Sequence, residues 1–146
     1  MLIRSFRLGD YVHITRIWQD TGLEQTETET LDALAKQLAW DSDLVMIAEH
    51  EGEVAGVIVG TIDGTRGYFY RLAVNPELQG MGIGRKLVEA LEKRFEERGV
   101  TRVFIMVNQD NKKVLPFYQQ LGYEVKEYIT LSKKLMLHTD TDIDIE

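Results

Sequence analysis

The sequence predicts a mixed α+β protein, because segments with the period of a strand alternate with segments with the period of a helix. We interpret their order as β-α-α-β-β-β-α-β-α-β. A second observation is the composition of the 146 residues, of which 44% are hydrophobic and 28% charged. That balance is typical of a soluble globular protein long enough to bury a core. A third is a glycine-rich run immediately before the longest predicted helix.

The N-terminal segments are predicted to be a strand followed by a helix. Residues 2–7 are interpreted as an opening strand, in which Leu2, Arg4 and Phe6 alternate with Ile3, Ser5 and Arg7. Gly9 and Asp10 should cap the helix that follows, because Asp is a preferred N-cap residue. The apolar stripe of this helix consists of Tyr11, Ile14, Ile17 and Trp18.

The next segments are predicted to be a second helix and a hairpin. Thr30 can cap a helix whose apolar residues are Leu31, Leu34, Ala35 and Leu38. Residues 44–50 and 54–62 read as two strands joined by a tight turn at residues 51–53. Residues 63–67 should form another turn, and residues 68–74 the third strand of a meander.

The second half should hold two helices and further strands. The longest helix has the apolar stripe Ile83, Leu87, Val88, Leu91 and Phe95 and ends at Gly99. Residues 103–107 are strongly apolar, which predicts a strand buried on both faces. The last helix should begin near Leu115, because Pro116 fits only the first turn. Residues 123–135 leave room for at most one long strand or a very tight pair.

The glycine-rich run predicts a phosphate-binding loop. It has the pattern Q-x-x-G-x-G, with Gln79, Gly82 and Gly84 in register, between a strand and a helix. Free backbone N–H groups and the positive end of a helix together bind anions. The run is not a P-loop, and Arg85 occupies the third glycine position of a dinucleotide fingerprint that begins at Gly80.

This loop resembles the acetyl-CoA pyrophosphate loop of the GNAT superfamily of acetyltransferases. Residues 111–123 also resemble that superfamily's N-x-x-x-x-x-[LF]-Y-x-x-x-G-[FY] segment, and the chain is most similar to its small, single-domain YpeA-like branch. The resemblance covers residues 2 to about 135. It implies α/β/α layers: a twisted mixed sheet of about six or seven strands with helices on both faces. It also implies a splay between the strands at 68–74 and 102–107, one domain over residues 1–137, and an acidic tail at 138–146.

The resemblance further implies that acetyl-CoA is the co-substrate, with no metal. Two of the residues would be catalytic: the backbone N–H near Leu72 would stabilise the oxyanion, and Tyr118 would protonate the leaving thiolate. The residues expected to bind acetyl-CoA are Leu72, Ala73, Val74, Gln79, Gly80, Met81, Gly82, Ile83, Gly84, Arg85, Asn111, Phe117 and Tyr118.

No general base is predicted. Some relatives in the superfamily carry a glutamate five residues before the asparagine, where this chain has Met106. The base could be Glu27 or Glu29, acting through water, or Tyr70, and none of the three stands out. Five acidic residues without a neighbouring Lys or Arg could form a negative lip that attracts a cationic amine, or could be a solvated helix start. They are Asp20, Glu24, Glu27, Glu29 and Asp32.

The predicted function is therefore N-acetylation of a primary amine, on a cationic small molecule or a protein, by direct attack on acetyl-CoA in a ternary complex. The absence of cysteine excludes an acetyl-cysteine intermediate. The alternative is a non-catalytic acyl-CoA-binding sensor or regulatory module. A net charge of −7 argues against nucleic acid, and the lack of a long apolar run or signal peptide predicts a cytoplasmic protein without membrane contact. A homodimer that completes the C-terminal strand region is a further possibility.

Overall fold

A computed structural model describes residues 1–22, 36 and 42–136. The chain divides into two compact units, Met1–Lys112 and Lys113–Glu146, and each is described by itself. The predicted helix at 30–38 and the predicted acidic tail at 138–146 lie outside the described residues, apart from Lys36. The boundary between one domain and a tail stays a prediction.

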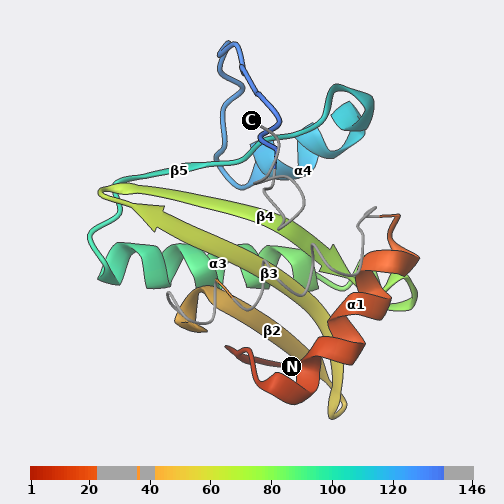
Figure 1. Ribbon diagram of the computed structural model, residues 1–146. Coiled ribbons are helices and arrows are strands. Elements are labelled where there is room, and N and C mark those ends of the chain that lie inside the picture. The colour runs from red at the N-terminus through yellow and green to blue at the C-terminus, as the bar shows by residue number, and fades with distance from the viewer. Residues whose placement is uncertain (23–35, 37–41, 137–146) are drawn as a thin grey trace, which may run out of the picture. The chain divides into compact units, whose positions relative to one another are not determined.

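The first unit is built on a mixed sheet of five strands (Figure 1). The strands are β1 (Leu2–Ser5), β2 (Val45–His50), β3 (Glu53–Asp63), β4 (Arg66–Val74) and β5 (Arg102–Phe104), and they lie in this order across the sheet. All neighbours are antiparallel except β4 and β5, which are parallel. The predicted fold class is confirmed, with five strands in the described part of the chain instead of six or seven.

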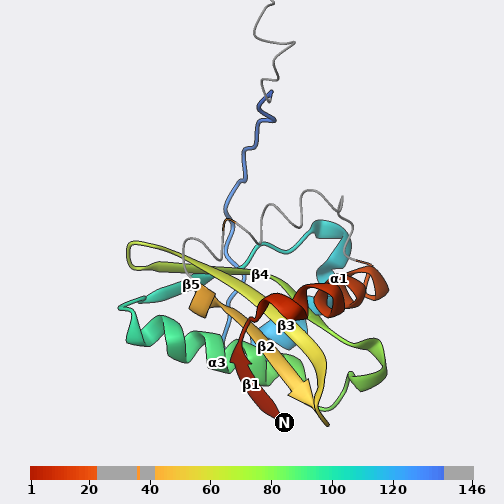
Figure 2. The ribbon, with the colours of Figure 1, turned by 60° about the horizontal axis from the view of Figure 1, so that its bottom comes forward.

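Helices cover both faces of this sheet (Figure 2). One face is covered by α1 (Tyr11–Asp20), and the other by α3 (Ile83–Glu97). Shorter helical turns are η1 (Leu8–Asp10), η2 (Ser42–Leu44), η3 (Pro76–Leu78) and η4 (Gln109–Val114). The second unit contains α4 (Leu115–Gln120), which begins at the predicted residue. Among the described helices, none has the length and apolar character needed to cross a membrane.

The helix stripes predicted from the sequence form the core. Ile14, Ile17 and Trp18 of α1 pack with Val45 and Ile47 of β2 on one side of the sheet. On the other side, all five apolar residues of the α3 stripe are buried. The helix ends as predicted, because the Gly99 N–H donates to the Glu96 carbonyl at 3.1 Å and Gly99 has a φ of 83°.

A track of three glycines lets α3 lie close to the sheet. A Cβ added to Gly56 would lie 3.0 Å from a methyl carbon of Leu87, and one added to Gly60 would lie 3.0 Å from Leu91 and Phe95. A Cβ on Gly67 would lie 2.9 Å from the Phe95 ring. We expected Gly67 in the turn at 63–67, but β4 already begins at Arg66. Gly67 therefore serves helix packing, while Gly64, with a φ of 61°, forms the turn.

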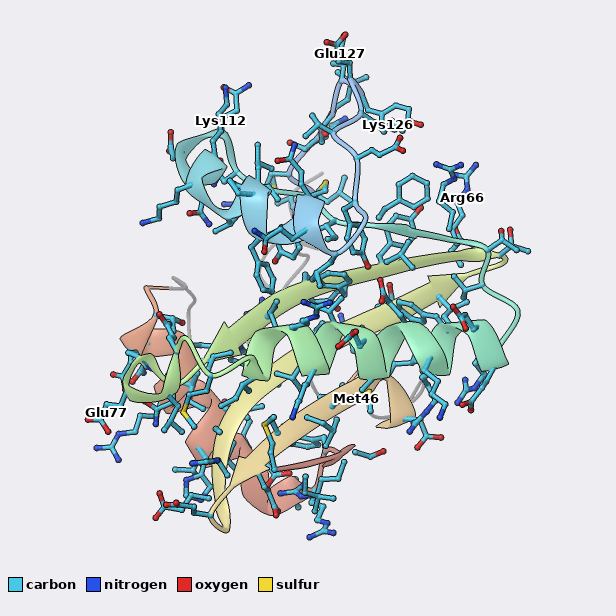
Figure 3. All side chains as sticks on the ribbon, turned by 180° about the vertical axis from the view of Figure 1, so that it is seen from behind. Met46, Arg66, Glu77, Lys112, Lys126 and Glu127 are labelled. Carbon is cyan, nitrogen blue, oxygen red and sulfur yellow. The ribbon has the colours of Figure 1, made fainter. Side chains whose placement is uncertain are left out.

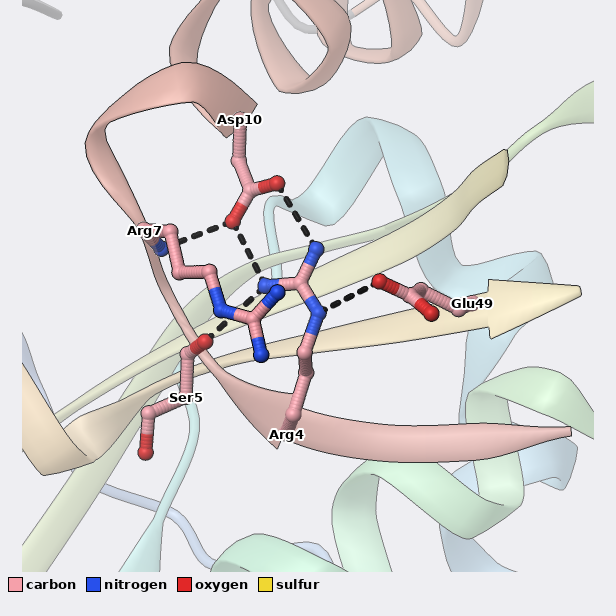
Figure 4. A network of polar contacts seen from close by, with 5 residues as sticks. All are labelled: Arg4, Ser5, Arg7, Asp10 and Glu49. Carbon is pink, nitrogen blue, oxygen red and sulfur yellow. Dashed lines mark hydrogen bonds and ion pairs between the residues drawn. The ribbon is translucent and has the colours of Figure 1, made fainter. Parts of the chain in front are cut away.

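A polar network ties β1 to the start of α1 (Figure 4). Arg4 donates to both carboxylate oxygens of Asp10 at 2.8 Å, and its Nε donates to Glu49 at 2.6 Å. The Arg7 N–H also donates to Asp10, at 2.7 Å. Asp10 is the N-cap residue of α1, as predicted, but its carboxylate accepts from Arg4 and Arg7 and makes no capping hydrogen bond to the helix.

Two predicted strands differ in the structure. β5 covers only Arg102–Phe104, and Val103 is half-buried, so the prediction of a strand at 103–107 buried on both faces was wrong. In the described residues it pairs with β4 alone. Residues 123–136 form no strand, and most of their apolar side chains are exposed. An extended segment needs a partner strand, and the described residues of the second unit contain none.

Candidate active site

The C-terminal half of β4 runs past the end of its neighbour. β4 and β5 pair only from Arg66 opposite Arg102 to Tyr68 opposite Phe104, where the two rings stack at 5.4 Å. β4 continues to Val74 with no further partner from β5. The predicted binding residues Leu72, Ala73 and Val74 lie on this continuation, so the main chain here has an edge that β5 does not use.

The segment after β4 is tied back to the strand by side-chain hydrogen bonds. The Asn75 Oδ1 accepts from the Glu77 N–H at 3.0 Å, and the Gln79 Nε2 donates to the Val74 carbonyl at 3.3 Å. Figure 3 shows Glu77 projecting outward from η3. Gln79 therefore has a local structural role, which brings the start of the glycine-rich loop to the end of the strand.

The loop itself has the backbone expected of an anion-binding turn. Gly80 and Gly82 have φ angles of 86° and 82°, and a Cβ added to either would meet nothing within 4 Å. The Lys86 N–H donates to the Gly82 carbonyl at 3.1 Å, which is the first bond of the helix ladder. The N–H groups of residues 82–85, which include Ile83 and Gly84, precede that bond and have no partner within the helix.

The environment of the loop suits a phosphate group. Met81 and Arg85 are both exposed, and the Arg85 Nε lies 3.7 Å from the Glu89 carboxylate. The open space beside the glycines, the free helix N–H groups and the helix dipole together fit a pyrophosphate. The residues predicted to bind phosphate thus lie together on one loop and the first turn of one helix.

The remaining predicted residues lie further along the chain. Asn111, in the first unit, is exposed in a kinked turn, and its N–H donates to the Asn108 carbonyl at 2.8 Å. In the second unit, the Tyr118 ring contacts Phe117 at 5.1 Å and Tyr123 at 6.1 Å, edge to face. Burial raises the pKa of the Tyr118 hydroxyl, so this group stays protonated at neutral pH.

The described residues add no general base to those considered from the sequence. Burial raises the pKa of Tyr70, against a smaller opposing effect of Arg71, so less of the Tyr70 hydroxyl is deprotonated and able to accept a proton at neutral pH. Met106 is 79% exposed and carries no ionisable group. Glu27 and Glu29 lie outside the described residues, as does the acidic lip except Asp20. No group of three potential metal ligands occurs in the part of the chain that the structure describes.

Two residues beside the site were not predicted from the sequence. Arg71 has a φ of 58° inside β4, and the Trp18 Nε1 donates to its carbonyl at 3.2 Å. Trp18, which the sequence places on the apolar stripe of α1, is 2% exposed and belongs to the core. The only signal available was that a buried indole N–H needs an acceptor, and the sequence does not say which one.

Comparison with known proteins shows the class of protein to which this chain belongs. The chain matches the acetyltransferase (GNAT) family over residues 11–123. It belongs to this family.

Individual proteins give the same result. An acetyltransferase of Pectobacterium atrosepticum is 36% identical over 136 residues, which are 93% of this chain and 96% of that protein. Ard1 from Thermoplasma volcanium is similar in structure, with a TM-score of 0.76 and 25% identity over 86% of this chain and 84% of that one. Naa20 from Chaetomium thermophilum, solved with a bisubstrate analogue, is also similar, with a TM-score of 0.76 and 27% sequence identity. The match covers 86% of this chain and 72% of that one.

Proposed function

We propose that this acetyltransferase moves the acetyl group of acetyl-CoA to a primary amine by direct attack, without a covalent enzyme intermediate. The observation that carries the proposal is the glycine loop at the start of α3, which follows the part of β4 that β5 does not pair with. A pyrophosphate on the loop would direct the pantetheine arm along this edge, where β5 leaves main-chain groups of β4 available. The absence of cysteine in the sequence supports direct transfer.

In this mechanism the chain binds, orients and moves protons. Acetyl-CoA supplies the reactive thioester, and the amine nitrogen attacks its carbonyl carbon. A C–N bond forms and the C–S bond breaks. The Leu72 N–H would stabilise the negative charge that develops on the carbonyl oxygen. Tyr118 would give its proton to the departing sulfur, a role for which a hydroxyl that is protonated at neutral pH is suited. The nitrogen would lose one proton to water as the amide forms, and a proton from water would restore the Tyr118 hydroxyl.

The acceptor is proposed by class only. The acidic residues between positions 20 and 32 favour a cationic amine, on a small molecule or on a protein. No residue is assigned as a base, and the acceptor is proposed to attack as the neutral amine and to lose one proton to water as the amide forms. Turnover should then increase with pH as the acceptor loses its proton.

The experiment is release of free CoA thiol from acetyl-CoA with polyamines, aminoglycosides, amino acids and short peptides as acceptors. The proposal predicts turnover that depends on the acceptor and is concentrated on cationic amines. Mass spectrometry of the acceptor should show one added acetyl group, which identifies the atom modified.

A second outcome would point to the alternative. If the folded protein binds acetyl-CoA but releases no thiol with any acceptor in the panel, a non-catalytic acyl-CoA-binding module becomes the better description. If it does not bind acetyl-CoA at all, the assignment of the loop is wrong.

A further inference from the structure

β4 contains an irregularity next to the proposed oxyanion group. Val57 pairs with Ala73 and Val59 pairs with Tyr70, so β4 has two residues between these pairs where β3 has one. The two residues are Arg71 and Leu72. Arg71 takes up the extra length with a φ of 58°, a left-handed conformation that is unfavourable for a residue with a side chain. Such a conformation persists only where the surroundings hold it.

Trp18 of α1 holds this residue by two contacts. Its Nε1 donates to the Arg71 carbonyl at 3.2 Å. The Arg71 guanidinium carbon lies 5.3 Å from the centre of the indole ring, which is within the range of a cation–π contact. Trp18 is itself 2% exposed and packs in the core between α1 and the sheet, so it is a rigid anchor.

The Arg71 carbonyl and the Leu72 N–H belong to the same peptide group. This group is planar and trans, so its C=O and N–H point in opposite directions. A hydrogen bond that fixes the carbonyl therefore also fixes the direction of the N–H, which points away from the indole. Accepting a hydrogen bond at the oxygen also polarises the amide and makes its N–H a better donor.

We infer that Trp18 is a positioning residue, which aims the Leu72 N–H at the acetyl carbonyl through the shared peptide group. The inference rests on the proposed function, because it assigns Trp18 a part in the oxyanion interaction proposed for Leu72. Trp18 does not touch substrate in this scheme. It sets the orientation and strength of one backbone donor.

The test measures the carbonyl of bound acetyl-CoA directly and needs no acceptor. Acetyl-CoA labelled with ¹³C at the acetyl carbonyl is bound to the protein, and the C=O stretching frequency is recorded by isotope-edited infrared spectroscopy. In the wild type, a hydrogen bond from Leu72 should lower this frequency relative to free acetyl-CoA. In Trp18→Phe, at least half of this shift should be lost, while the Kd for acetyl-CoA changes less than about threefold.

Kinetic constants should show the same contrast, with a large effect on the chemical step and a small effect on binding. With an acceptor found in the thiol-release panel, Trp18→Phe should lower kcat about tenfold and leave the KM for acetyl-CoA nearly unchanged, because an oxyanion donor acts mainly in the transition state. Thr15→Val is the matched control. It also removes one hydrogen-bond donor from α1, since the Thr15 hydroxyl donates to the Tyr11 carbonyl at 2.7 Å, but that bond stays within the helix.

Trp18→Phe leaves space in the core and could unfold the protein. Replacement of Trp18 by benzothienylalanine, in which sulfur takes the place of the ring N–H, removes the donor and keeps the shape. It should give the same loss of shift as Trp18→Phe. If either folded variant keeps the full wild-type shift, the inference about Trp18 is overturned and the proposed function is untouched. If the wild type binds acetyl-CoA with no shift, or fails to bind it, the role of Leu72 falls and the inference falls with it.

Discussion

Tyr118 is the residue whose side chain the proposed mechanism needs most. Tyr118→Phe removes the hydroxyl and keeps the edge-to-face contacts with Phe117 and Tyr123. We expect kcat to fall by about 10² to 10³, within the range of general acid catalysis, with the Kd for acetyl-CoA unchanged. The measurement is thiol release beside a binding titration. Equal turnover in the variant and the wild type would remove Tyr118 from the mechanism.

The pH dependence of turnover gives a separate prediction for Tyr118. A general acid works only while protonated, so its activity is lost as the pH rises through its pKa. Because burial raises the pKa of Tyr118, that loss should lie above the ordinary tyrosine value of about 10. Any decline in kcat that is present in the wild type and absent in Tyr118→Phe should therefore begin above a pH of about 10. A decline centred near pH 8 would contradict the assignment.

The Asp10 carboxylate contributes to the stability of the fold. Burial alone would raise its pKa, but the hydrogen bonds from Arg4 and from the Arg7 N–H outweigh burial and hold the pKa of Asp10 below its usual range. Such a carboxylate stabilises the fold above its unfolded pKa, near 3.9, and this stability is lost as the pH falls through the lower folded value.

We therefore expect Asp10→Asn to lower the free energy of unfolding by about 3 kcal/mol at neutral pH. The difference from wild type should shrink below a pH of about 4, as the wild-type carboxylate takes up its proton. Urea denaturation across this pH range measures both effects. Glu89→Ala is the control, because its exposed pair with Arg85 should contribute less than about 0.5 kcal/mol. Equal losses in the two variants would refute a special role for Asp10.

At the scale of elements, α3 offers an internal comparison between its two ends. Gly82 before the helix and Gly99 after it have φ angles of 82° and 83°, and both are open to solvent. Alanine at either position should cost about 1 kcal/mol of stability, because a side chain disfavours this conformation. Only Gly82→Ala should also weaken acetyl-CoA binding, since only Gly82 lies in the loop. Loss of affinity for acetyl-CoA in both variants, or in neither, would contradict the proposed phosphate-binding role of the glycine-rich loop.

The packing of α3 on the sheet depends on the absence of a side chain at Gly67. Gly67→Ala places a methyl carbon 2.9 Å from the Phe95 ring, which must shift. We expect a loss of about 1–3 kcal/mol in the free energy of unfolding, typical of overpacking. Gly9→Ala, where an added Cβ meets nothing within 4 Å, should change stability by less than about 0.5 kcal/mol. Thermal unfolding of both variants decides whether the glycine track is needed.

For the whole molecule, the charge is concentrated at one end. Asp140, Asp142, Asp144 and Glu146 carry four of the negative charges, so a chain ending at residue 137 would have a net charge of −3 instead of −7. We expect this truncation to change kcat and the KM for acetyl-CoA less than about twofold, because the sequence predicts that residues 138–146 are a tail outside the domain. Kinetics and unfolding of the truncated chain check this. A large loss of either would place the tail in the domain.

Elements held by local periodicity were predictable from the sequence. Every apolar residue of the α3 stripe is buried, and the hairpin turn lies where Gly52 suggested, because period and turn chemistry are properties of short segments. β5 is shorter than its apolar sequence indicates, since strand length depends on a partner. The partner of Asp10 was not predictable either. A capping rule considers only neighbouring residues in the sequence, whereas Asp10 pairs with Arg4 of β1.

The predicted site likewise contains parts that short sequence patterns reveal and parts that depend on the fold. The loop followed from glycine spacing, and the structure gives Gly80 and Gly82 the left-handed backbone that such a loop needs. The contact between Trp18 and Arg71 joins residues 53 positions apart, and no local pattern encodes it. The bulge that makes Arg71 left-handed is likewise a product of register between two strands, which the sequence of either strand alone does not reveal.

Because α3 packs on the glycine track, a substitution in the track should also affect the loop at the start of α3. Phe95 and Ile83 are twelve residues apart on one continuous helix, a distance of about 18 Å. Because the helix is a stiff rod seated on bare backbone at Gly56, Gly60 and Gly67, it has few ways to adjust locally. A bulky substitution at the far end would tilt or slide the whole rod and so displace the loop at its start. Random mutagenesis for weakened cofactor affinity should therefore return variants at Gly60 and Gly67, remote from any bound phosphate.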